Sequence, residues 1–145
     1  MEIKTHKLYY AGRLMRWGKG TVVKNPNGWI YLGGTEGRDP ETDLVVPGET
    51  AQARLCFEKI KAALEEMGSS LDNIVKLWYY VVGDFPEGLG NSTRWENIIK
   101  VREEFFRKHA PQLCAENNPP TCDLLGVKCL ARPEMVIEIA CTAVF

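Results

Sequence analysis

Two amphipathic helical patterns, set among short β-prone runs, constrain the fold of this chain more than any other feature. In the first, residues 49–67, apolar side chains recur at helical spacing and Gly68 is suited to end the helix. The second is predicted at 94–109, where Thr93 and Glu96 have the spacing of a capping box. One side of this helix carries Trp95, Ile98, Ile99, Arg102, Phe105 and Phe106. Both helices therefore need a broad apolar surface to pack on.

The β-prone runs supply that surface. They are "KLYY", "GTVVKN", "WIYLGG" and residues 73–82, 121–130 and 134–145. Asn-Gly in "KNPNGW" is a strong hairpin signal, so Thr21–Lys24 is expected to pair with Trp29–Gly33. The last two runs, joined by the tight connector "ARPE", are expected to form a second hairpin. The order β-β-β-α-β-α-β-β predicts a single α+β domain over residues 1–145, with both helices on one face of a mixed sheet.

Composition excludes several classes of function. The net charge is −1 with both signs interspersed, so no nucleic-acid or anionic-lipid footprint is expected. No apolar run is long enough to span a bilayer, and the N-terminus lacks the apolar core of a signal peptide. The cysteines are odd in number and lack C-x-x-C spacing, which indicates a reducing, cytoplasmic setting. With only His6 and His109 and no phosphate loop, neither a metal nor an organic cofactor is expected.

The final run, "MVIEIACTAVF", holds a single acid among apolar residues. Burying a lone carboxylate costs several kcal/mol unless it is paired, hydrogen-bonded or protonated. Alternation places Val136, Glu138, Ala140, Thr142 and Val144 on one face of this strand. Because the helices cover only one face, the face around Glu138 is expected to meet another subunit across a polar cleft. The alternatives are an exposed edge glutamate and a structural ion pair.

A second unusual stretch, "PPTCDLLGVKC", puts Thr121, Cys122 and Asp123 at the start of a strand. If the connector closes a hairpin, Glu138 lies opposite Gly126, whose missing side chain opens space beside the carboxylate. Cys122 shares the face of Gly126, about 13 Å further along the strand. Cys122 and Glu138 of one chain would then bracket a small molecule without touching. The alternative for Cys122 is a small buried hydrophobe.

The third stretch, "YLGGTEGRDP", has two glycines at the end of a strand. Glycines at a strand end allow a ligand to approach the backbone closely. A strand exit followed by a turn explains the same residues, and no Gly-Lys-Ser/Thr follows to make a phosphate loop.

Taken together, these segments resemble the RidA/YjgF family of small proteins that hydrolyse imines and enamines. The resemblance is carried by "WIYLGGTEG", by "ETAQARLCFEKIKAALEEMGSSLDNIVKLWYYV", by "VREEFF" and by "PPTCDLLGVKCLARPEMVIEIACTAV". It implies a fold similar to that of chorismate mutase, and a homotrimer with its sites in the clefts between subunits. It also agrees with the element order predicted above.

The resemblance assigns roles to individual residues. Glu138 falls on the family's glutamate, which is implicated in holding or activating the attacking water. Gly34 matches the glycine whose backbone lines the pocket, and Trp17 takes the place of a pocket aromatic. The family usually has proline, a small residue, arginine and serine where this chain has Pro120–Asp123, and asparagine where it has Ile99. The arginine that forks onto a substrate carboxylate is therefore absent, and a thiol cannot replace that contact.

We therefore expect a cytoplasmic homotrimer that hydrolyses a carbon–nitrogen bond in a small imine or enamine, with Glu138 transferring protons. Cys122, Asp123 and Thr121 are expected to contact the substrate in place of the arginine. An aminomuconate-type deaminase is a more specific hypothesis, since such enzymes occur in this family. Two alternatives remain: a hydrolase with Cys122 as nucleophile, and a non-enzymatic ligand-binding or chaperone-like trimer. RNA cleavage has been claimed for family members, but the charge balance does not support it here.

Overall fold

The computed structural model describes all 145 residues and confirms the predicted order of strands and helices. The elements are β1 (Glu2–Tyr10), β2 (Arg13–Lys24), β3 (Trp29–Glu36), α1 (Glu49–Glu66), β4 (Ile74–Val82), α2 (Thr93–His109), β5 (Thr121–Val127) and β6 (Ile137–Val144). Neither helix has the combination of length and apolar character needed to cross a membrane.

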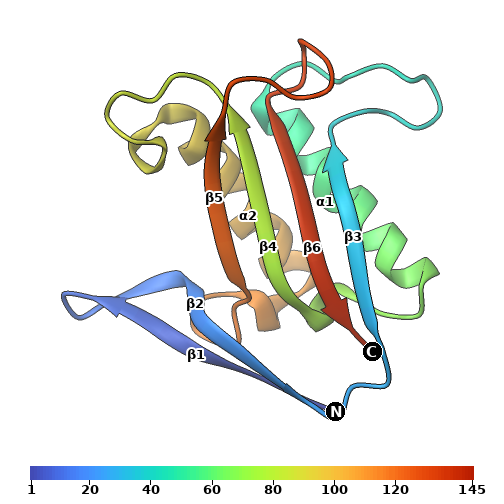
Figure 1. The fold of residues 1–145 in the computed structure, drawn as a ribbon, viewed down its shortest axis with the longest axis vertical. Helices are drawn as coiled ribbons and strands as arrows, with labels where there is room; N and C mark the ends of the chain where they lie inside the picture. Colours follow the sequence, from blue (N-terminus) through green and yellow to red (C-terminus); the bar gives the residue numbers. More distant parts are fainter.

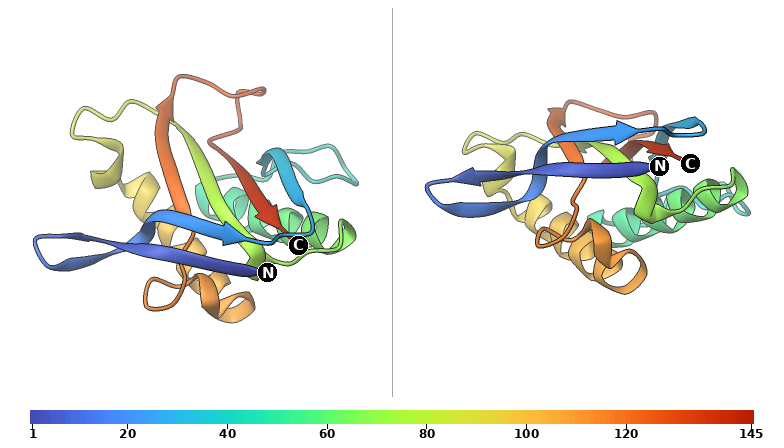
Figure 2. Two further views of the ribbon diagram at one scale, coloured as in Figure 1. Left: turned by 60° about the horizontal axis from the view of Figure 1, so that its bottom comes forward. Right: turned by 90° about the horizontal axis from the view of Figure 1, so that it is seen from below.

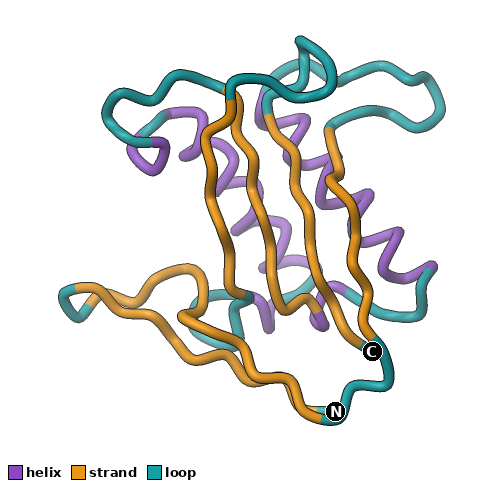
Figure 3. Tube along the Cα trace, in the orientation of Figure 1, coloured by secondary structure: helices purple, strands orange, loops and turns teal.

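The strands form two sheets. A four-stranded mixed sheet has the order β3-β6-β4-β5, in which β4 and β5 are parallel and the other pairs are antiparallel. Both helices lie on the same face of this sheet, as predicted (Figure 1 and Figure 2). Strands β1 and β2 form a separate antiparallel hairpin that extends from one end of the larger sheet (Figure 3).

The hydrophobic core fills the space between the helices and the larger sheet. From β6 it takes Ile137, Ile139, Cys141 and Ala143, the set that alternation predicted for one face. On the helices, Phe57 of α1 stacks against Phe105 of α2 and meets Phe106 edge to face. Each large apolar side chain that is buried stabilises the fold by about 1.5–3 kcal/mol. The summed burial of this layer determines which face of β6 points toward the helices.

The predicted pairing of Thr21–Lys24 with Trp29–Gly33 is wrong. Strand β2 pairs with β1, and β3 pairs with β6. The "KNPNGW" segment joins the two sheets instead of closing a hairpin, because its backbone bonds to the end of the chain. The amides of Asn27 and Gly28 donate to the carbonyl of Phe145, at 2.6 and 3.0 Å. Pairing with the apolar strand β6 therefore prevails over the local turn signal.

The predicted hairpin between the last two strands is also wrong. Strand β6 lies between β3 and β4, and β5 lies on the far side of β4 at the edge of the sheet. The connector that follows β5 therefore crosses the end of β4 before β6 begins (Figure 1). As a result Glu138 pairs with Tyr80 and Glu36, and Gly126 pairs with Val81. Strand β6 is mostly buried and takes a central position, whereas β5 has no buried residue and takes an edge.

The N-cap residue of helix α2 lies one position before Thr93, the predicted cap. The Ser92 hydroxyl, and not that of Thr93, accepts a hydrogen bond from the Trp95 amide at 3.1 Å. At the end of α1 the prediction is confirmed, since Gly68 has φ of 82° and its amide donates to Glu65.

A buried glutamine ties three segments together beside the sheet. Gln52 of α1 is fully buried, and its amide nitrogen donates to the carbonyls of Val46 and Glu134, at 2.9 and 2.8 Å. Its amide oxygen accepts from the backbone N–H of Val136 at 2.9 Å. One side chain thus connects the loop that precedes α1, the connector that follows β5, and the residue just before β6. Gly37 packs so closely on Gln52 that an added Cβ would lie 2.5 Å from the glutamine side chain.

Replacing this glutamine should destabilise the fold. Gln52→Leu keeps the bulk but leaves two carbonyls and one amide unpaired, which should lower the free energy of unfolding by about 3 kcal/mol. Urea unfolding at one fixed protein concentration measures the change. The matched control is Gln112→Leu, at an exposed position, which should stay within about 0.5 kcal/mol. Equal losses for the two variants would show that the three bonds contribute little.

Candidate active site

Glu138 lies near the start of β6, on the sheet face that the helices leave open. It is half-buried and has no ion-pair or hydrogen-bond partner in the chain, so a structural ion pair within one chain does not explain it. The neighbouring strands present aromatic side chains on the same face: Trp29 and Tyr31 are 47% and 75% exposed, and Trp78 and Tyr80 are half-buried. Tyr80 is the direct neighbour of the unpaired acid on β4 and Trp78 lies two residues further along, whereas Trp29 and Tyr31 lie toward the other end of β6.

The carboxyl group of Glu138 rests on the backbone of Gly34. The pairing of β3 with β6 shifts between Leu32 and Thr35, which places the two glycines in a bulge. A Cβ added to Gly34 would lie 2.4 Å from Cδ of Glu138, whereas one added to Gly33 would meet nothing within 4 Å. The structure therefore brings together Gly34 and Glu138, two of the site residues that the sequence singled out.

The surroundings of Glu138 favour its protonated form. Partial burial raises the pKa of its carboxyl group, and the negative charge of Glu36 raises the pKa further. A raised pKa makes the carboxylate of this residue a stronger base, which favours general acid–base catalysis.

Cys122 lies elsewhere, on the opposite face of the sheet. It pairs with the fully buried Leu77, so its side chain points toward the helices, while Thr121 and Asp123 point to the open face. Two strand spacings, about 10 Å, also separate β5 from β6. The expectation that Cys122 and Glu138 of one chain bracket a small molecule on a shared face is therefore wrong. It failed because it depended on the hairpin that does not form.

A buried arginine lies close to Cys122. Arg102 of α2 is 1% exposed, and its guanidinium donates to the Tyr79 hydroxyl at 2.9 Å, to Glu103 at 2.8 Å and to the carbonyl of Arg16 at 3.4 Å. Burial raises the pKa of the Cys122 thiol to about 11, although the charge of Arg102 opposes this. A thiol with that pKa is protonated near neutrality and is a weak nucleophile.

Trp17, Thr121 and Asp123 gather at the β5 edge. Trp17 is partly buried against the core, and the amide of the next residue, Gly18, donates to the carbonyl of Pro120 at 3.1 Å. Asp123 forms an ion pair with Lys76 at 2.8 Å. The Thr121 hydroxyl is one wall of a pocket of about 290 Å³. The pocket is lined by Thr21, Val23, Trp29, Val75, Lys76, Trp78, Thr121 and Thr142, and does not include Glu138.

The predicted site residues therefore form two groups in one chain. Gly34 and Glu138 lie together at the β3–β6 pair, and Trp17 and Thr121–Asp123 lie at the β5 edge. Sequence reasoning did not single out Glu36, whose place beside Glu138 depends on a long-range pairing. Sequence reasoning did place Arg102 on the apolar side of α2. A single arginine among apolar residues on one side of a helix indicates a buried polar cluster, so this residue could have been recognised.

Comparison with known proteins gives this arrangement a family. The family model described as Endoribonuclease L-PSP matches residues 15–145, and the chain belongs to that family. The resemblance to RidA/YjgF proteins is thereby confirmed, since solved structures of that group share the fold. The Rid family protein YyfB of Yersinia pestis has a TM-score of 0.68 at 21% identity, over 89% of this chain and 86% of that one. The YjgF gene product of E. coli has a TM-score of 0.64 at 25% identity, over 88% and 87%.

Relatives identified by sequence match a shorter part of the chain. A RutC family protein of Pyrococcus abyssi is 41% identical over 86 residues, which is 57% of this chain and 60% of that protein. A RutC family protein of Aquifex aeolicus is 28% identical over 81 residues, which is 56% of this chain and 58% of that protein. The chain thus aligns with about three fifths of the length of each relative.

The contact between Gly34 and Glu138 can be tested by adding one methyl group. Gly34→Ala should fold, because the atoms that its Cβ would meet are the mobile end of the glutamate side chain. It should displace that carboxyl group and change its titration, followed by NMR of carboxyl-labelled glutamate. Gly33→Ala, where the added atom meets open space, is the matched control and should titrate as the parent does. Identical titrations in both variants would contradict the close contact.

Proposed function

We propose that this protein is a homotrimeric hydrolase that deaminates a small imine or enamine, with Glu138 transferring protons in a cleft between subunits. One observation carries the proposal: Glu138 is half-buried, unpaired in its own chain and raised in pKa, and rests on the backbone of Gly34. Family membership supports it. The fold is also shared by E. coli TdcF, whose structure holds bound serine, at a TM-score of 0.66, 22% identity and coverage of 92% and 91%.

The chemistry follows from one carboxyl group working in two directions. The Glu138 carboxylate removes a proton from water as the water oxygen bonds to the imine carbon, and the C=N electrons move to nitrogen. The carboxylic acid formed in this way then gives its proton to the nitrogen. The carbinolamine then collapses to a carbonyl: Glu138 takes the hydroxyl proton and passes it to the amine nitrogen, the C–N bond breaks and ammonia leaves. Imine and water are consumed, carbonyl compound and ammonia are produced, and Glu138 returns to its starting state.

Two chains are needed to complete the site. In one chain Glu138 and Cys122 point to opposite faces of the sheet. A neighbouring subunit packed on the open face would cover the aromatic side chains around Glu138 and bring a second β5 edge toward it. Exposed aromatic side chains of this kind are typical of the buried centre of a subunit interface.

The substrate follows from the residues at the β5 edge. Cys122 offers no guanidinium for a carboxylate, and Arg102 is buried with its donors already bonded. Imines of simple 2-amino acids are therefore poor candidates, and we propose a substrate that Asp123, Thr121 and Cys122 contact by other means. An aminomuconate-type amino-dienoic acid is the more specific hypothesis. The raised pKa of Cys122 argues against a covalent mechanism.

Two substitutions should affect catalysis differently. Glu138→Gln keeps size but removes the base, so kcat should fall by roughly 10²–10⁴-fold with little change in KM. Cys122→Ser should chiefly raise KM and leave measurable turnover. Steady-state kinetics on candidate imines measures both, with Glu134→Gln, at an exposed position in the connector, as the control.

Two results would refute these roles. If Cys122→Ser is as inactive as Glu138→Gln and mass spectrometry of quenched enzyme finds an adduct on Cys122, the cysteine is the nucleophile. If the parent protein binds imines but never turns them over, the non-enzymatic alternative holds.

A further inference from the structure

Glu138 has a second carboxyl group as its direct cross-strand neighbour. Glu36 is the last residue of β3, and its Cα is the register partner of Glu138 in the antiparallel β3–β6 pair. Directly opposed residues of an antiparallel pair place their side chains on the same face, with Cβ atoms about 4.5–5.5 Å apart. Both glutamates are half-buried. Like charges in this arrangement are destabilising, so the pairing calls for a functional explanation.

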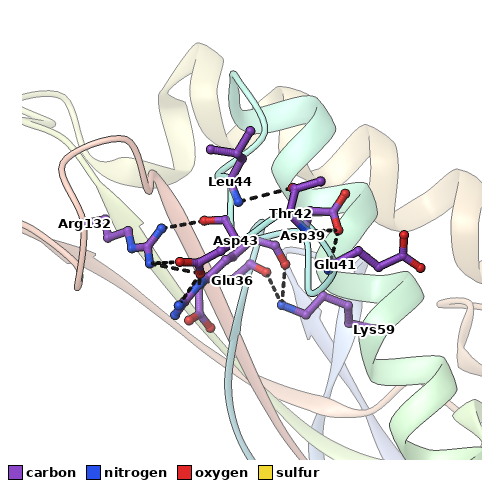
Figure 4. A network of polar contacts seen from close by, with 9 residues as sticks. Glu36, Asp39, Glu41, Thr42, Asp43, Leu44, Lys59 and Arg132 are labelled. Carbon is purple, nitrogen blue, oxygen red and sulfur yellow. Dashed lines mark hydrogen bonds and ion pairs between the residues drawn. The ribbon is translucent and has the colours of Figure 1, made fainter.

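The cations nearby do not neutralise the pair. Lys59 of α1 donates its ammonium to the backbone carbonyls of Glu36 and Arg38, at 2.9 and 3.0 Å, and not to either carboxylate. Arg38 in turn bonds to Asp43, which Arg132 also contacts at 3.1 Å through both carboxylate oxygens (Figure 4). These interactions order the loop after β3 but leave the Glu36 side chain without an ion-pair partner.

The other titratable groups near Glu138 come from β4 and α1. On β4 the register partner is Tyr80. Behind the sheet, Cys56 of α1 donates its thiol to the carbonyl of Thr35 at 3.1 Å, and burial raises its pKa to about 12. Glu36 is therefore the charged side chain that acts most directly on Glu138, and it acts as a like charge.

We propose that Glu36 is a second functional carboxyl group of this site, and that it and Glu138 together hold one proton during catalysis. This rests on the function proposed above. In the singly protonated pair, one group is a carboxylate that takes a proton from water, and the other is an acid that gives a proton to the departing nitrogen. One proton enters the pair and one leaves it in each of the two steps, addition of water and loss of ammonia, so the pair ends as it began.

Carboxyl titration in the chain of residues 1–145 tests the pair without needing any substrate. NMR of carboxyl-labelled glutamate, with Glu138→Gln used for assignment, should show Glu138 titrating above the ordinary glutamate value of about 4.3. Glu36→Gln removes the like charge, so the Glu138 midpoint should fall. The matched control is Glu41→Gln, an exposed glutamate of the adjoining loop, and it should leave the midpoint unchanged. A midpoint in Glu36→Gln equal to that of the parent would overturn the proposal.

The pH profile then tests the use of the proton. With the singly protonated pair as the active form, kcat/KM should be bell-shaped, and its alkaline limb should move to lower pH in Glu36→Gln. If Glu36→Gln still hydrolyses the substrate and its alkaline limb does not move, this inference is overturned and the proposed function stands. If Glu36 and Glu138 titrate as a coupled pair but the protein hydrolyses no imine, the proposed function is refuted and the shared proton of the pair is still supported.

Discussion

The architecture depends on one constraint: two helices cover a four-stranded sheet on one face only. The inward residues of β6, such as Ile137 and Ile139, are fully buried in the core on the helix side of the sheet. Alternation then forces Glu138 onto the other face, among aromatic residues that the chain itself does not fully cover. The same apolar layer that holds the domain together thus presents a carboxyl group in a surface suited to another subunit.

Within this frame, a few polar contacts place the carboxyl group. Gln52 bonds to the backbone at Val136, two residues before Glu138, and so fixes where β6 begins. The bulge in β3 provides Gly34 as the surface on which the carboxyl group rests, and the same strand ends at Glu36. The pKa of Glu138 is thereby set by backbone geometry, which determines both its burial and its nearest like charge.

The sequence was sufficient for what local pattern determines. Helical spacing located both helices, alternation separated the two faces of β6, and the lone glutamate was recognised as out of place. Strand pairing was not predictable from local signals, because β3 and β6 lie about a hundred residues apart and the Asn-Gly turn favoured a nearer partner. The wrong pairing placed Gly126 opposite Glu138, where the structure has Glu36. It also placed Cys122 on the same face of the sheet as Glu138, whereas the two lie on opposite faces. The Ser92 cap was missed by a single residue, within the usual uncertainty of helix ends.

The central claim is that the site is completed between chains, since one chain places Glu138 and Cys122 on opposite faces of its sheet. Sedimentation equilibrium at micromolar concentration tests this most directly. The account predicts a particle with three times the 16.4 kDa mass of one chain. A monomer mass under the same conditions, in protein that hydrolyses an imine, would contradict it, because Glu138 would then act on a surface exposed to water.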